Sequence, residues 1–196
     1  MFDLILLIKT AGYLGIGGII FSESGLLFGL LFPGDSLLFT AGFLASQGFL
    51  NIWILSIVAF MSAVLGDSFG YWFGKKIGVK IFSRQKSHFL SKDHLIKAED
   101  FFVKHGPKAL VLARFIPIVR TLVPILAGVG KMNYRVFLTY NLIGAFLWVV
   151  GVSFLGYFLG NIIPNVDNYL LPIIILIILL SILPNLIHFI RYKIKK

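Results

Sequence analysis

The strongest constraint on this chain is that charged residues lie inside long apolar stretches. Two of these stretches, residues 23–36 and 113–124, each contain two charged residues of one sign. These residues are Glu23, Asp35, Arg114 and Arg120. An ionised group at the centre of a bilayer costs about 2.5 kcal/mol or more, so it requires a partner, water or a function. We therefore expect the acidic and the basic stretch to meet in one polar site within a membrane.

Each of the two stretches also contains residues that interrupt a helix. They are Pro33, Gly34, Pro117 and Pro124. Proline lacks a backbone N–H, and glycine adopts conformations that other residues avoid. Irregular backbone is tolerated at membrane depth only where it is buried in protein or lines a cavity. We therefore predict that each stretch is a broken, re-entrant segment, and that these four residues form its hinges.

The composition indicates an integral membrane protein. A soluble domain has about 25% charged residues, whereas this chain of 196 residues has 13% charged and 58% hydrophobic residues. Its mean hydropathy is +0.94. The predicted fold class is an all-α membrane protein, a polytopic helical bundle with two inverted re-entrant hairpins.

The sequence contains no recognisable metal, cofactor or catalytic motif. Cysteine is absent, which excludes disulfides and cysteine-based metal sites. The histidines lack the spacing of a metal-binding pair, and the glycine-rich runs lack the lysine and hydroxyl residues of a nucleotide loop. We expect no metal, no cofactor and no enzymatic activity.

The net charge of +10 is concentrated beside the apolar spans. Residues 75–108 and the C-terminal residues 191–196 hold most of the cations. Cations that flank apolar spans are typical of cytoplasmic segments. We therefore expect both segments to be cytoplasmic, and we exclude nucleic acid as a partner.

We interpret residues 1–196 as a single membrane domain. Residues 51–74 and 136–160 are long enough to cross a bilayer at about 1.5 Å per residue. Within the basic segment, a helix over roughly residues 92–105 is predicted to lie on the inner membrane surface. The expected order is an N-terminal helix (1–22), a re-entrant hairpin plus span (23–74), a basic segment (75–108), a second re-entrant hairpin plus span (109–160), a last span (172–190) and a basic tail (191–196).

A weak internal repeat connects the two halves at an offset of 86 residues. Each copy contains an Ala-Gly pair followed by a Gly-Tyr-x-x-Gly motif. The matching residues are Ala41-Gly42 with Ala127-Gly128, and Gly70-Tyr71 and Gly74 with Gly156-Tyr157 and Gly160. The cations place the two copies in opposite orientations, which is typical of transporters built from inverted repeats. The alternative is a chance match between residues that are common in membrane helices.

The two arginines favour a site for a phosphate group. A guanidinium group binds two phosphate oxygens at once through its planar fork. Pro117 lies between Arg114 and Arg120, so both side chains can converge on one anion, and a half-helix beginning near Thr121 adds backbone donors. The alternative is that the arginines only neutralise Glu23 and Asp35.

The acidic residues favour proton coupling or gating. A carboxyl group in a low-dielectric site takes up a proton more readily, so Glu23 and Asp35 could pair with arginine in the empty site and protonate when phosphate displaces them. The alternative for Asp35 is a helix N-cap. Asp67 is expected to pair with Lys75 or Arg120.

Three motifs occur in a characteristic order. They are Glu23 with Phe32-Pro33-Gly34-Asp35, Gly66-Asp67-x-x-Gly70-Tyr71-x-x-Gly74, and Arg114-Phe115-x-Pro117-x-x-Arg120-Thr121. Together they resemble the DedA family of bacterial inner-membrane proteins, which is similar to eukaryotic lipid scramblases that share its VTT domain. The resemblance covers roughly residues 10–165. It implies movement of a phosphate-bearing lipid between leaflets, either undecaprenyl phosphate or phosphatidylethanolamine, with coupling to protons. The acids and arginines of the family motifs are all present.

We therefore expect a lipid transporter in the bacterial cytoplasmic membrane. Its expected partners are membrane phospholipids or polyprenyl phosphate, and protons. A homo-oligomer is compatible with the sequence, which does not determine the oligomeric state. Two alternatives stay open: a small-ion or proton antiporter, and a membrane lipid phosphatase or transferase that uses the same arginines.

Overall fold

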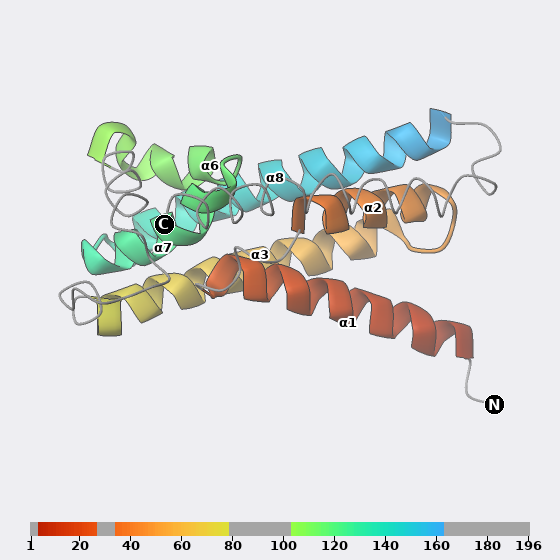
Figure 1. Ribbon diagram of the computed structural model, residues 1–196, viewed down its shortest axis with the longest axis horizontal. Coiled ribbons are helices and arrows are strands. Elements are labelled where there is room, and N and C mark those ends of the chain that lie inside the picture. The colour runs from red at the N-terminus through yellow and green to blue at the C-terminus, as the bar shows by residue number, and fades with distance from the viewer. Residues whose placement is uncertain (1–3, 27–33, 79–102, 163–196) are drawn as a thin grey trace, which may run out of the picture.

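The computed structural model describes residues 4–26, 34–78 and 103–162, and these residues are almost entirely helical with no strand among them (Figure 1). The predicted all-α class is therefore confirmed. The longer helices are α1 (Leu4–Gly25), α2 (Gly34–Ser46), α3 (Ile52–Phe73), α7 (Pro117–Val129) and α8 (Tyr134–Ile162). Three short elements connect them, namely the π-helix η2 (Gly74–Gly78), the 3-10 helix η3 (Gly106–Lys108) and α6 (Ala109–Ala113).

Two long apolar helices, α3 and α8, run antiparallel through the molecule (Figure 1). With its extension into η2, the first covers 25 residues and the second covers 29, which is enough to cross a membrane at about 1.5 Å per residue. The side chains of Trp53, Ile57, Met61 and Leu65 form an exposed stripe on α3. Large apolar side chains pointing outward at helical spacing suit contact with lipid.

Two shorter helices start near the middle of the molecule and run to opposite ends (Figure 1). They are α2, which packs along α8, and α7, which packs along α3 and η2. Glycines allow both contacts, because a Cβ at Gly42 would clash with the Ser153 carbonyl, and a Cβ at Gly128 would clash with the Tyr71 carbonyl. Small residues permit such close backbone approach in membrane proteins. Each half of the chain thus supplies the long helix on which the short helix of the other half packs.

The breaks in the two stretches differ from the predicted ones. Helix α1 continues to Gly25, so Glu23 lies in its last turn and not in a re-entrant segment. Gly34 is the first residue of α2, and Pro117 the first of α7, after Ile116 in an extended conformation. Pro33 lies outside the described residues.

The prediction that Pro124 breaks the helix is wrong, because α7 runs through it. The proline ring lies close to Gly70 of α3. A Cβ added to Gly70 would be 3.7 Å from the Cβ of Pro124. Packing against the neighbouring helix keeps α7 continuous, although proline removes one backbone hydrogen bond. The re-entrant course of both hairpins stays a prediction.

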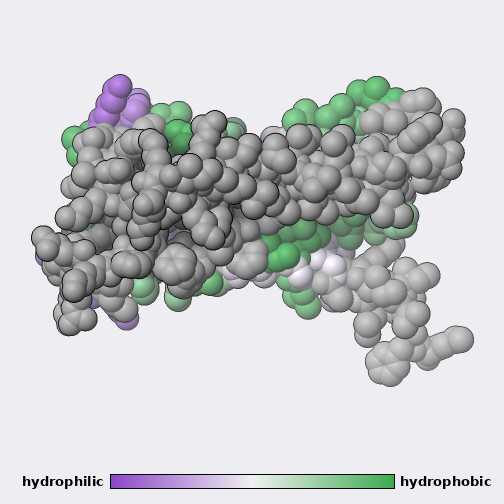
Figure 2. All heavy atoms as spheres, in the orientation of Figure 1, coloured by the Kyte–Doolittle hydropathy of each residue, from purple (hydrophilic) through white to green (hydrophobic). Residues whose placement is uncertain are grey.

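The described cations are distributed unevenly. Lys9 lies on α1, Arg114 follows α6 and Arg120 lies on α7. The other six lie at the end of the molecule where α3 ends and α8 begins, namely Lys75, Lys76, Lys104, Lys108, Lys131 and Arg135. Figure 2 shows hydrophilic atoms at this end, at the left, and groups of apolar atoms toward the centre and the upper right. The cytoplasmic location of this end stays a prediction from the positive charge. Most of the predicted surface helix over residues 92–105, the last span (172–190) and the tail (191–196) lie outside the described residues.

Candidate functional site

Arg120 joins three helices at the centre of the described structure. It lies on α7, and its Nη1 donates to Asp35 Oδ1 on α2 at 2.8 Å. Its Nη2 pairs with Glu23 Oε1 on α1. The predicted contact between the acidic and the basic stretch is therefore present. We refer to Arg120, Glu23 and Asp35 as the Arg120 cluster.

Two glycines allow close packing of helices beside the Arg120 cluster. Helix α1 packs on α3 where Gly25 meets Gly66, because a Cβ on Gly25 would be 2.8 Å from the Gly66 carbonyl oxygen. A Cβ on Gly34 would overlap the Glu23 carboxylate. The absence of a side chain at Gly34 thus lets the start of α2 approach the end of α1. Gly34 therefore matters here because it leaves space for the Glu23 carboxylate.

Asp35 and Thr121 do not have the backbone positions expected from the sequence. Asp35 is in the first turn of α2, one residue inside the helix, and not at the N-cap. An acidic side chain in this turn is still favoured by the helix dipole.

Because α7 begins at Pro117, Thr121 lies in its second turn and its N–H is not among the unpaired first-turn donors. The Thr121 side chain is buried, and Thr121 directly follows Arg120 in the sequence.

Trp148 on α8 completes the Arg120 cluster. Its Nε1–H donates to Asp35 Oδ1 at 2.7 Å, and its ring lies 5.3 Å from the Arg120 Cζ. Sequence reasoning missed this residue. A signal was available, because Trp148 occurs in the middle of a long apolar helix, whereas membrane tryptophans concentrate at the two interfaces. A buried indole N–H requires a partner.

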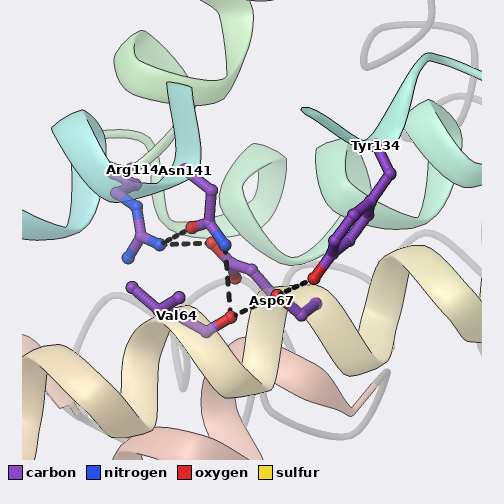
Figure 3. A network of polar contacts seen from close by, with 6 residues as sticks. Val64, Asp67, Arg114, Tyr134 and Asn141 are labelled. Atoms are coloured by element: carbon purple, nitrogen blue, oxygen red, sulfur yellow. Dashed lines mark hydrogen bonds and ion pairs between the residues drawn. The ribbon is translucent and has the colours of Figure 1, made fainter. Parts of the chain in front are cut away.

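Arg114 forms a second, separate cluster with side chains of α3 and α8 (Figure 3). Its Nη2 pairs with Asp67 Oδ2 and donates to Asn141 Oδ1 at 2.5 Å. Asn141 in turn donates from Nδ2 to the Val64 carbonyl at 3.2 Å. We refer to Arg114, Asp67 and Asn141 as the Arg114 cluster. Asn141 was not identified from the sequence.

The expected partner of Asp67 is corrected by this geometry. Asp67 pairs with Arg114, not with Lys75 or Arg120. Lys75 instead places its Nζ 5.0 Å from the centre of the Trp72 ring. The sequence places Asp67 two helical turns from Lys75, but it does not determine which side of α3 faces Arg114.

The two clusters differ in their access to the surroundings. In the Arg114 cluster, the side chains of Arg114 and Asp67 are only 6% and 8% exposed. In the Arg120 cluster, Arg120 and Glu23 are 13% and 3% exposed, but Asp35 is 50% exposed. The Arg114 cluster is therefore enclosed, whereas the Arg120 cluster opens to the outside through Asp35.

A small cavity of about 10 Å³ lies between the two clusters. Its lining residues are Ser24, Asp67, Arg114, Arg120 and Trp148. This volume holds about one water molecule, so it has no room for a phosphate group in this arrangement. In this arrangement Arg120 contacts its carboxylates through both Nη1 and Nη2. Glu23 Oε2 and Arg114 Nε are buried without a hydrogen-bond partner among the described residues, so both retain bonding capacity.

Comparison with known proteins identifies similar sequences. The VTT domain matches residues 32–158. The chain is 45% identical over 177 residues to Protein DedA of Escherichia coli, which covers 89% of this chain and 80% of that protein. It is 46% identical over 169 residues to the uncharacterized membrane protein ML0287 of Mycobacterium leprae (86% and 75%), and 36% identical over 147 residues to the inner membrane protein YqjA of E. coli (73% and 65%). No solved structure matches.

Proposed function

The chain belongs to the DedA family of membrane proteins, and from this premise we propose that it moves a phosphate-bearing lipid across the cytoplasmic membrane by exchange at Arg120. Membrane phospholipid or polyprenyl phosphate is the substrate, with phosphatidylethanolamine and undecaprenyl phosphate as the two candidates. The observation that carries this proposal is the pairing of Arg120 with two carboxylates from two different helices.

The chemistry of the Arg120 cluster suits exchange between anions. A carboxylate and a phosphate present similar oxygen pairs to a guanidinium group. Arg120 keeps its positive charge, so a lipid phosphate can take the place of Asp35 and Glu23 only if the charge of the displaced acids is compensated. Uptake of a proton by either carboxyl group provides this compensation and would couple lipid movement to protons.

The access of Asp35 gives the exchange a direction of entry. Asp35 is half exposed, whereas Glu23 is buried, so Asp35 is the carboxylate that an incoming headgroup reaches first. The surrounding helices α3 and α8 present large apolar side chains outward. A lipid could therefore keep its hydrocarbon tail in the bilayer while only its phosphate enters the protein.

The Arg114 cluster has a supporting role in this proposal. Its arginine already has two partners, and both Asp67 and Asn141 are buried. We assign it the task of holding α6 against α3 and α8, in place of the headgroup binding that the sequence suggested for Arg114. Two other functions remain as rivals, a proton or small-ion antiporter that uses the same acids, and a lipid phosphatase or transferase.

Purified protein in proteoliposomes can test the proposal. Labelled undecaprenyl phosphate and labelled phosphatidylethanolamine would be followed between leaflets for the wild type, Arg120→Ala and Asp35→Asn. Arg135→Ala is the matched control, because Arg135 is an exposed arginine at the start of α8. We expect Arg120→Ala to lose at least about 90% of the movement of one lipid, and Arg135→Ala to retain it. Equal movement in the wild type and Arg120→Ala would refute the proposal, and release of free phosphate would favour the enzyme.

A further inference from the structure

Trp148 makes two contacts of different chemistry within the Arg120 cluster. The indole N–H donates to Asp35 at 2.7 Å, and the ring face lies 5.3 Å from the guanidinium carbon of Arg120. The side chain is 3% exposed, and it lines the cavity between the two clusters. No other tryptophan in the described residues is buried to this extent, since Trp53 is 67% and Trp72 is 43% exposed.

The two contacts of Trp148 respond differently when the Arg120 cluster opens. If an anion replaces the carboxylates, the hydrogen bond from the indole N–H to Asp35 is lost when Asp35 moves away. The ring face does not carry a charge and does not compete with an anion for the N–H groups of the guanidinium. Arg120 can therefore keep its contact with the ring while its edge binds a new partner. A guanidinium group stacked on a ring retains its donors in the plane of the fork.

We propose that Trp148 is a positioning residue for the phosphate site, one that holds Arg120 through its ring and Asp35 through its N–H. This inference rests on the proposed function, because it assigns a task to Trp148 in binding the lipid phosphate. In the closed arrangement the N–H favours the pairing of Asp35 with Arg120. In the open arrangement the ring keeps the long Arg120 side chain at the site, which lowers the entropy lost when the headgroup binds.

The packing around Trp148 supports a fixed ring. Trp148 belongs to a buried cluster with Ile20, Leu38, Ala63 and Val149, which come from α1, α2, α3 and α8. The indole thus belongs to a buried cluster that α8 shares with three other helices. A ring with this support can position a flexible arginine, whereas an exposed ring could not.

Two substitutions separate the ring from the N–H. Trp148→Phe keeps an aromatic face and removes the donor, whereas Trp148→Leu removes both. In proteoliposomes with increasing fractions of labelled lipid phosphate, we expect Trp148→Leu to raise the half-saturating lipid fraction at least about tenfold, which is the scale of a desolvated cation–π contact. Trp148→Phe should remain within about threefold of the wild type, because the aromatic face is retained.

The half-saturating fraction distinguishes positioning from a merely structural role. A structural role would reduce the amount of folded protein without changing the half-saturating fraction of the protein that remains folded. Trp53→Leu is the matched control, because Trp53 is an exposed tryptophan far from Arg120 in the chain, and it should behave as the wild type. An unchanged half-saturating fraction in Trp148→Leu, or an equal effect of Trp148→Phe and Trp148→Leu, would overturn the proposal.

A second measurement tests the contacts without transport. The chain has 3 tryptophans, so the double variant Trp53→Phe, Trp72→Phe leaves Trp148 as the sole indole fluorophore. We expect its emission to change on Asp35→Asn and on Arg120→Leu, and to stay constant on Arg135→Leu. Constant emission in all three variants would refute the contacts. If the emission responds but the wild type moves neither lipid, the proposed function fails, whereas the position of Trp148 beside Arg120 stands.

Discussion

The two arginine clusters have the same ingredients but different surroundings. Each contains an arginine, at least one carboxylate and a neutral polar side chain from α8. In the Arg114 cluster the neutral partner is Asn141, an amide that shares the guanidinium with Asp67. In the Arg120 cluster it is Trp148, which touches Arg120 only through its ring. Asn141 thus shares Nη2 of Arg114 with Asp67, whereas Trp148 leaves the N–H groups of Arg120 to the carboxylates.

The two clusters also differ in how deeply their charged side chains are buried. Arg114 and Asp67 are both more than nine-tenths buried. Removal of one member of such a pair leaves an uncompensated charge and costs about 3–5 kcal/mol. Asp35 is half exposed, and exposed pairs typically contribute only about 0–1 kcal/mol. The clusters thus differ in one carboxylate, Asp35, which is half exposed, whereas Glu23 and Asp67 are both buried.

The largest predicted effect is on folding, from Arg114→Leu. It leaves Asp67 buried with no cation, so we expect a loss of about 3–5 kcal/mol of stability. Thermal unfolding in detergent micelles would show a clear decrease in Tm. Asp35→Leu is the companion variant and should lower stability less, because Asp35 is half exposed and Glu23 still pairs with Arg120. Equal losses of stability in the two variants would remove the distinction between the clusters.

A second prediction concerns a substitution that displaces Arg120 without replacing any residue of the two clusters. Gly128→Ala introduces a Cβ that clashes with the Tyr71 carbonyl and forces α7, the helix of Arg120, away from α3. Overpacking of this kind costs about 1–3 kcal/mol. Lipid movement should fall more than stability does, because the position of Arg120 depends on this contact. Gly151→Ala is the matched control, because a Cβ there has no neighbour within 4 Å, and a similar loss in both variants would contradict the assignment.

The general fold and the main charge contact could be predicted from the sequence for one physical reason. A charge within an apolar span is so costly that it must find an opposite charge. That rule identified Glu23, Asp35 and Arg120 and the contact between them, which the structure contains. The two long spans followed from the length of the apolar segments, and they coincide closely with α3 and α8.

The finer assignments depended on information that the sequence does not carry. The pairing of Asp67 with Arg114 depends on how α6 is rotated against α3, which spacing along one chain does not determine. Pro124 does not break α7, because a contact with Gly70 of another helix supports it. Asn141 is uncharged, so its single polar group in an apolar helix gave only a weak signal before its partners were known.

The third prediction concerns the neutral partner of the Arg114 cluster. Asn141→Leu removes the bonds to Arg114 and to the Val64 carbonyl. A buried group left without its hydrogen bond costs about 1–3 kcal/mol, so we expect a decrease in Tm that is smaller than that of Arg114→Leu. Lipid movement per folded molecule should remain near that of the wild type. A selective loss of transport with unchanged Tm would instead place Asn141 at the substrate.

The smallest predicted effect on stability comes from Asp35→Asn. The amide keeps an oxygen that can accept from Trp148 and Arg120, and the position is half exposed. We therefore expect a change in stability within about 1 kcal/mol.

The same variant should have a larger effect on the pH dependence of lipid movement than on Tm, because an amide at this position cannot exchange a proton. In the wild type, acidification neutralises carboxylates and releases Arg120, so movement should rise as the pH falls until headgroup binding limits it. In Asp35→Asn the rise should be weaker, and the remaining dependence would belong to Glu23. Glu23→Gln in the same background tests this division. If the double variant keeps the full pH dependence of the wild type, the carboxylates of the Arg120 cluster do not exchange the proton, and they serve Arg120 only as fixed counter-ions.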